Sequence, residues 1–257
     1  MRQLIFYILI FICPGVLFGQ YILQDSIQVA KPLTEIALDE QGNIYGIEQN
    51  QTLIKIGEQK KISRFKLTGH LNNLRVHSSL LLSLQLNNEL HLLDNHLNPT
   101  QDPIHLQTAG YILQQTDVID NNFLIGYDAI SHKIIQLNYQ LGRIINTSPI
   151  LTMIPWEEKI TKLQYDKKSI YLITDKSLYT FDEFLTFKKK LDIPEYQSIL
   201  LNHGKIYLQH ENQLIIFDPS NSTTTTIYNG KISNFTANRT QLIVDNDKVL
   251  YIYKFTN

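Results

Sequence analysis

A short apolar run recurs six times along this chain of 257 residues, and this repetition restricts the fold more than any other feature. Successive copies begin 36 to 44 residues apart. They are Leu53–Ile56, Leu90–Leu93, Ile134–Leu137, Leu178–Phe181, Leu214–Phe217 and Leu250–Tyr253. A period of about 40 residues predicts one supersecondary unit per copy, with each unit burying its apolar surface against the next.

Each copy follows a partner run across a short polar loop, and each such pair predicts a β-hairpin. The loops include Asp175-Lys176 and Asn246-Asp247, and Asn and Asp tolerate the left-handed backbone of tight turns. A short run precedes each hairpin, as at Ile160–Tyr165, and a fourth follows most of them, as at Leu185–Leu191. Four antiparallel strands per unit are typical of a propeller blade. We therefore predict an all-β, six-bladed β-propeller of four-stranded antiparallel blades.

The two ends of the repeat region complement each other. The sixth unit reaches Asn257 after its third strand, whereas Tyr21–Val29 is an extended run that has no place in the first unit. We predict that Tyr21–Val29 is the N-terminal strand closing the last blade, as its outer strand. Such a closure joins the ring and leaves no open sheet edge there.

The first unit carries the sequence Asp39-Glu40-Gln41-Gly42-Asn43-Ile44-Tyr45. It resembles the Asp-x-x-Gly-Asn-Ile-Tyr element of NHL-type repeat propellers and related six-bladed propellers. Fainter versions stand at Asp166–Tyr171 and His203–Tyr207. The resemblance implies the fold along nearly the whole chain, and it carries over no catalytic residue.

Residues 1–19 have the pattern of a secretory signal peptide, which leaves residues 20–257 as a single propeller domain. Arg2 precedes the apolar run Leu4–Ile12, and Pro14-Gly15 then interrupt it. The run is shorter than the ~20 residues of a membrane span, so we expect no span in the mature chain. An uncleaved anchor and lipidation at Cys13 are the alternatives. We expect export to the periplasm, the outer surface or the medium.

Composition and missing motifs exclude several classes of function. The formal net charge is −1 and the basic residues are scattered, so no nucleic-acid footprint is present. Cys13 is the only cysteine, and its loss with the signal peptide would exclude disulfides and thiolate chemistry. The sequence has no Gly-x-Ser-x-Gly, phosphate-loop, dinucleotide-binding or His-Glu-x-x-His motif. We therefore expect a non-catalytic protein without a cofactor, and a monomer.

Acidic and amide side chains nevertheless leave an enzymatic alternative open. Six-bladed lactonases and related sugar-acid hydrolases bind calcium in the central channel through Glu, Asn and Asp side chains. Similarity in blade number implies the candidate ligands Glu35, Asp117, Asp120, Asn202 and Asn234, and oxygen ligands suit Ca²⁺. The alternative function is thus a calcium-dependent lactonase-type hydrolase. By contrast, we expect Asp94, Asn138, Asp182 and Asp218, which end third strands, to bond their own turns.

Propellers usually bind partners at the face formed by inter-blade connections and hairpin loops. The connection Leu151–Lys159 places Trp156 beside two carboxylates, and Trp is a favoured anchor at interaction surfaces. The candidate contacts on this loop face are His70, Trp156, Glu157, Glu158 and Tyr196. We predict a binding module for a protein, peptide or glycan. A sensor module for a membrane partner is a third hypothesis, and for Trp156 the alternative is that its ring fills the space between the third and fourth blades.

Overall fold

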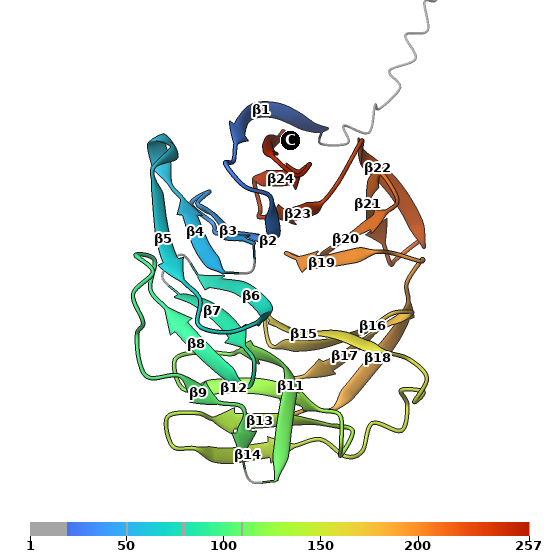
Figure 1. The fold of residues 1–257 in the computed structure, drawn as a ribbon. Helices are drawn as coiled ribbons and strands as arrows, with labels where there is room; N and C mark the ends of the chain where they lie inside the picture. The colour runs from blue at the N-terminus through green and yellow to red at the C-terminus, as the bar shows by residue number, and fades with distance from the viewer. Residues whose placement is uncertain (1–19, 50, 79–80, 109, 257) are drawn as a thin grey trace, which may run out of the picture.

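The computed structural model describes residues 20–49, 51–78, 81–108 and 110–256. The predicted signal peptide, residues 1–19, lies outside the described residues. In the described part the strands form six antiparallel sheets arranged around a central axis (Figure 1). The predicted six-bladed β-propeller is therefore confirmed.

The blades are numbered in chain order, and each is given from its inner to its outer strand. Blade 1 contains β2 (Leu33–Leu38), β3 (Ile44–Glu48), β4 (Thr52–Ile56) and β5 (Ile62–Lys66), with a 3₁₀ turn at Glu58–Lys60. Blade 2 contains β6 (Leu71–Ser78), β7 (Leu81–Leu86), β8 (Glu89–Leu93) and β9 (Ile104–His105). Blade 3 contains β11 (Tyr111–Val118), β12 (Phe123–Asp128), β13 (Lys133–Asn138) and β14 (Arg143–Thr147), and β10 (Gln107–Thr108) pairs with the start of β11.

The second half of the ring repeats this plan. Blade 4 contains β15 (Ile160–Asp166), β16 (Ser169–Thr174), β17 (Ser177–Asp182) and β18 (Phe187–Asp192). Blade 5 contains β19 (Ser198–Asn202), β20 (Lys205–His210), β21 (Gln213–Asp218) and β22 (Thr223–Asn229). Blade 6 contains β23 (Asn234–Ala237), β24 (Gln241–Asp245) and β25 (Val249–Thr256), and its fourth strand is β1 (Gln20–Gln28).

The hydrophobic core is divided among the spaces between blades. Successive side chains of a strand point to opposite faces, so Leu53 and Ile54 of β4 enter different spaces. Leu53 packs in the cluster shared with blade 2, and Ile54 packs in the cluster shared with blade 6. Each of the six spaces holds one such cluster of described residues. This explains why both neighbours in a third strand are apolar.

The motif of the first blade is a turn that locks its own backbone. Asp39 Oδ1 accepts hydrogen bonds from the backbone N–H groups of Gln41 and Asn43, at 3.0 and 2.8 Å. The buried Tyr45 hydroxyl donates to Asp39 Oδ2 at 3.2 Å. Gly42 has a φ of +86°, and a Cβ there would lie 2.8 Å from the Gln241 side chain of blade 6. The motif therefore serves the turn and the blade contact.

The acidic and amide side chains at the ends of third strands also bond their own turns, as predicted. Asp94 accepts the N–H groups of His96 and Asn98, both at 2.8 Å. The equivalent acceptors are Asn138, Asp182 and Asp218. Hydrogen bonding therefore accounts for these side chains without a catalytic role.

The ring is closed by β1, which pairs antiparallel with β25 along its length and lies beside the C-terminal strands in Figure 1. The register runs from Gln20 opposite Thr256 to Gln28 opposite Val249. Tyr21 also reaches blade 5, where its hydroxyl lies 3.0 Å from the hydroxyl of Tyr207. The predicted closing strand is confirmed, and it contacts two blades.

The inner strands face the axis, where no other strand of the described residues covers their free edge except β10 at the start of β11. At all six junctions a side chain of one inner strand bonds the backbone of the next. The pairs are Glu35 with Leu74 N, Asn73 with Thr116 O, Asp117 with Tyr165 N, Gln164 with Leu201 O, Asn202 with Ala237 O, and Asn234 with Leu33 O. Buried backbone groups without partners are costly, so these bonds stabilise the blade order. Among the described residues, none of the helical segments has the length and apolar character needed to cross a membrane.

Deletion of residues 20–28 tests the closure. We expect the truncated protein to unfold or aggregate, because β25 loses its partner strand and the cluster between blades 6 and 1 loses the contacts of β1. Circular dichroism melts and size-exclusion chromatography measure the effect. A protein starting at residue 20 is the matched control. Equal melting temperatures for the two proteins would contradict the closure.

Candidate functional site

A cavity of about 420 Å³ lies at the propeller axis, and all six inner strands contribute to its lining. Glu35 of blade 1, Arg75 and His77 of blade 2, and Lys162 of blade 4 are among the ionisable residues that line it. Pockets of this size suit small molecules. The channel is therefore the first candidate site.

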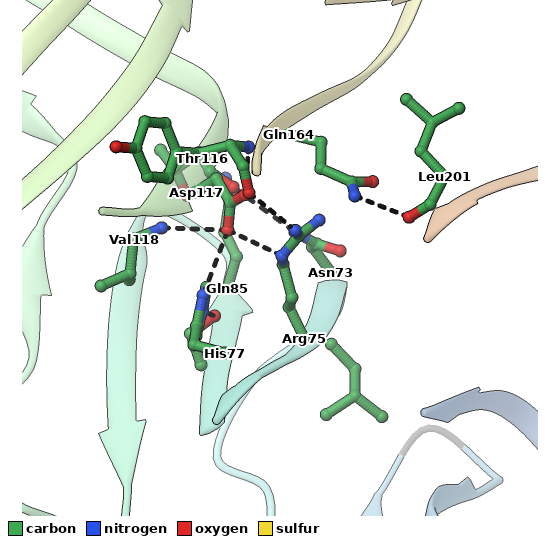
Figure 2. Close-up of polar contacts among 12 residues, drawn as sticks. Asn73, Arg75, His77, Gln85, Thr116, Asp117, Val118, Gln164 and Leu201 are labelled. Carbon is green, nitrogen blue, oxygen red and sulfur yellow. Dashed lines mark hydrogen bonds and ion pairs between the residues drawn. The ribbon is translucent and has the colours of Figure 1, made fainter. Parts of the chain in front are cut away.

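Asp117 lies at the centre of a polar cluster that joins blades 2, 3 and 4 (Figure 2). Its Oδ1 lies 3.0 Å from Arg75 Nε as an ion pair and accepts the N–H of Val118 at 3.0 Å. Its Oδ2 accepts the N–H of Tyr165 at 2.6 Å, while Arg75 Nη2 donates to the Tyr165 carbonyl at 3.1 Å. Burial raises the pKa of Asp117 to about 6, although Arg75 and the two N–H donors oppose the shift.

His77 extends this cluster. Its Nδ1 lies 3.5 Å from Asp117 Oδ1, and its Nε2 lies 2.6 Å from the Ser83 hydroxyl. Burial lowers the pKa of His77 well below its ordinary value, and the charge of Arg75 adds to the effect. The imidazole is therefore neutral at pH 7, and its two ring nitrogens are both directed at protein groups.

The structure distributes the five candidate calcium ligands over several roles. Glu35, Asn202 and Asn234 line the channel, but each bonds the neighbouring blade, as does Asp117. Asp120 is exposed and accepts the N–H groups of Asn122 and Phe123 in its own turn. Within the described ranges, no three His, Cys, Asp or Glu side chains are grouped to hold a metal ion. The calcium site stays a prediction.

The loop face carries a second candidate site around Trp156. Two consecutive turns, closed by Ile154 N to Leu151 O and Glu158 N to Pro155 O, shape this connection. Leu151 and Ile154 are buried between blades 3 and 4, which turns the intervening side chains outward. Trp156 is 71% exposed and does not fill the space between the blades, contrary to the alternative interpretation.

The Trp156 ring is held in place from one side. It stacks on His132 with the ring centroids 4.2 Å apart and an interplanar angle of 28°. The buried His132 is itself fixed by the Tyr127 hydroxyl, 2.7 Å from its Nδ1. The hairpin loop between β12 and β13, which carries His132, exposes Ile130. The connection between β14 and β15, which carries Trp156, exposes Ile150 and Met153. We call these three residues and Trp156 the Trp156 surface.

The other predicted contacts have different environments. Glu157 is exposed beside Trp156, whereas the nearly buried Glu158 accepts the Thr174 hydroxyl at 2.6 Å and the Tyr179 hydroxyl at 3.2 Å. The Tyr196 hydroxyl donates to the Thr174 carbonyl at 2.5 Å. Glu158 and Tyr196 thus meet at one hairpin and hold it. His70 is exposed on the connection between blades 1 and 2, apart from this group.

Sequence reasoning missed Arg75, Lys162 and Ile130. The repeat register contains a signal for Lys162, because it occupies the position in β15 that Glu35 occupies in β2. In both strands the next residue, Leu163 or Ile36, is buried and pairs with the second strand. An aligned set of inner strands would therefore have indicated a charged residue of each sign in the channel.

No protein-family model matches the chain, and no curated protein matches it. Solved propellers do match it. Virginiamycin B lyase from Staphylococcus aureus is 10% identical, with a TM-score of 0.61 over 93% of this chain and 100% of the lyase chain. The WD40 domain of Doa1 is 12% identical, with a TM-score of 0.58 over 92% and 97% of the two chains. The Pan2 WD40 domain of Neurospora crassa is 13% identical, with a TM-score of 0.57 over 92% and 96%.

These neighbours include lyases and WD40 domains, and identities of this level show the propeller fold alone. The predicted distant similarity to repeat propellers is confirmed at the level of the fold.

The pH dependence of stability tests the environment of Asp117. Its folded pKa of about 6 exceeds the ~3.9 of an unfolded Asp. The folded state therefore holds the proton more tightly, and the resulting stabilisation is complete below pH ~4 and lost as the pH rises through 6. We expect the free energy of unfolding of the wild type, relative to Asp117→Asn, to fall by about 2 kcal/mol between pH 4 and pH 7, because an unfolded Asp is already about half ionised at pH 4. Urea titrations measure it, and a pH-independent difference would contradict the raised pKa.

A thermal melt with calcium and again with chelator tests the metal alternative. We expect equal melting temperatures, because four of the five candidate ligands already hold neighbouring blades together. A ligand present at a hundredfold excess over its Kd stabilises the folded state by ~2.7 kcal/mol, so binding would be visible. A clear rise with calcium would contradict this expectation and call for a lactone-hydrolysis assay.

Proposed function

We propose that this chain is an exported, non-catalytic binding protein whose loop face docks onto a protein or peptide partner. One observation carries the proposal: Trp156 is largely exposed and stacked on His132, and the two loops that carry these rings expose three other apolar side chains. Interaction surfaces are enriched in Trp and Met, and buried aromatic anchors dominate their energetics. Propellers often act as binding domains, and an exposed aromatic anchor on the loop face is consistent with that role.

The rigidity of the Trp156 surface supports a role in recognition. Ordering a side chain on binding costs free energy, and stacking on His132 has already restricted the Trp156 ring. The Leu151 N–H also donates to the His132 carbonyl at 2.9 Å, which ties the two loops together. A partner would therefore meet an apolar surface whose main anchor is largely preorganised.

The channel residues favour binding over catalysis. Asp117 and His77 are the side chains there most suited to general base chemistry. Asp117 is paired with Arg75, and His77 contacts the Ser83 hydroxyl. The candidate ligands that hold the blades together give no support to the lactonase-type alternative.

Export is supported by the N-terminal sequence pattern of Arg2, Leu4–Ile12 and Pro14-Gly15. We propose that the mature protein acts in the periplasm, on the outer surface or in the medium. Mass spectrometry of the N-terminus from each cell fraction tests cleavage and location together.

Substitution of Trp156 tests the docking surface. A partner is captured on the wild-type protein from a cell-envelope extract, identified, purified and titrated against each variant. We expect Trp156→Ala to weaken binding at least tenfold, ~1.4 kcal/mol or more, because the anchor is lost. The melting temperature should hardly change, since the ring is exposed.

Phe184→Ala is the matched control. Phe184 is exposed to 72% and lies in the turn between β17 and β18, on the opposite end of blade 4 from the Trp156 loop. We expect it to leave both binding and stability unchanged. Equal binding by Trp156→Ala and wild type would overturn the proposed surface, and a polysaccharide as the captured partner would overturn the protein assignment.

A further inference from the structure

Two channel side chains of opposite charge stand on opposite sides of the ring. Glu35 belongs to β2 of blade 1 and Lys162 to β15 of blade 4, and blades 1 and 4 are three places apart in a ring of six (Figure 1). Both residues line the same cavity, and both occupy the same place in the repeat register. They therefore lie at a similar depth along the axis.

Glu35 and Lys162 attract each other electrostatically but make no direct contact. Among the described residues, no ion pair within 4.0 Å joins Glu35 to Lys162, and no hydrogen bond reaches the Lys162 ammonium. Glu35 Oε1 accepts the Leu74 N–H at 3.0 Å, which leaves acceptor capacity on the carboxylate. Lys162 lines the cavity and its ammonium has no hydrogen-bond partner in the described protein, so a ligand carboxylate could form a charge-assisted hydrogen bond with it.

The other ionisable side chains that line the cavity have partners or neighbours of opposite charge. Arg75 is paired with Asp117, His77 is neutral at pH 7, and Glu40 lies 2.6 Å from His203. Asp39 accepts hydrogen bonds within its own turn, and Asp166 and Lys167 are adjacent in the chain and opposite in charge. Glu35 and Lys162 therefore leave one negative and one positive group separated across a cavity of about 420 Å³. Such a site disfavours a net anion or a net cation and favours a molecule that carries both charges at once.

We propose that the channel binds a small zwitterion of amino-acid to short-peptide size, with its carboxylate at Lys162 and its ammonium at Glu35. Charge-assisted hydrogen bonds at both ends would orient the molecule along the line between the two blades. The volume of the cavity suits a ligand of this size. This site is separate from the Trp156 surface and does not depend on it.

Thermal melts of the full mature chain test the proposal with defined probes. The probes are the free amino acids, diglycine and triglycine, which lengthen the separation between ammonium and carboxylate. We expect at least one of them to raise the melting temperature by about 5 to 10 °C at a hundredfold excess over its Kd. N-acetyl-diglycine lacks the ammonium and diglycine amide lacks the carboxylate, and neither should give a comparable shift.

Two variants assign the binding to the named residues. Lys162→Met removes one charge and shortens the side chain by only one atom. Glu35→Gln removes the other charge at constant length, and the introduced amide oxygen can still accept the Leu74 N–H. We expect each to abolish the ligand-induced shift. Without ligand, Lys162→Met should melt at or above the wild type, because an unpaired charge has left the channel. Lys159→Met, a nearby exposed substitution, is the control and should retain the shift.

Each outcome either supports or overturns the proposed site. A shift that needs both ligand charges and both channel residues supports the zwitterion site. No shift with any probe overturns it, and so does an equal shift with the blocked analogues. Retention of the full shift in Lys162→Met would also overturn the assignment, even if the ligand binds elsewhere on the protein.

Discussion

The free edge of the inner strand is the constraint on which the rest of this propeller depends. Each inner strand presents backbone N–H and C=O groups to the axis, and no further strand pairs with most of them. At each junction between blades, a side chain of one inner strand bonds a backbone group of the next inner strand. Glu35 accepts such a bond from a backbone N–H, and Gln164 donates one to a backbone carbonyl. Because these bonds link six strands far apart in sequence, they also fix where the remaining channel side chains stand. The depth and facing of Lys162 follow from them.

The hydrophobic core is divided among six inter-blade spaces, and this division makes the stability of each blade depend on its neighbours. Every cluster needs two complete blades, so no blade can bury its apolar residues alone. The last blade is completed by β1, and the contact of Tyr21 with Tyr207 extends the closure to blade 5. Stability is therefore a property of the closed ring.

The sequence predicted blade number and closure because third strands such as Leu53–Ile56 are buried on both faces and recur at a regular interval. The bounds of the inner strands were harder to predict from the sequence. The apolar runs predict inner strands at Leu74–His77 and Asp117–Ile119, but β6 begins at Leu71 and β11 at Tyr111. Bulges shift the register of both strands, so the alternation that would mark their first residues is lost. The calcium candidates could not be separated from edge-bonding residues, since both roles use the same oxygen-bearing side chains. Trp156 was singled out by residue type, but its exposure depends on the turns anchored by Leu151 and Ile154, which no local pattern specifies.

The pairing of Gln20 with Thr256 also determines how the ring responds to force. A load applied at these two residues pulls perpendicular to the β1 and β25 pair, so its hydrogen bonds break one after another from the open end. The same pair loaded along its length would break all of them together. A chain tethered near residue 20 and pulled at its other end would thus open at the last blade while the other five blades still carry their own strands. The pairing of β1 with β25, which closes the ring, is therefore also the place where the ring first opens under this load.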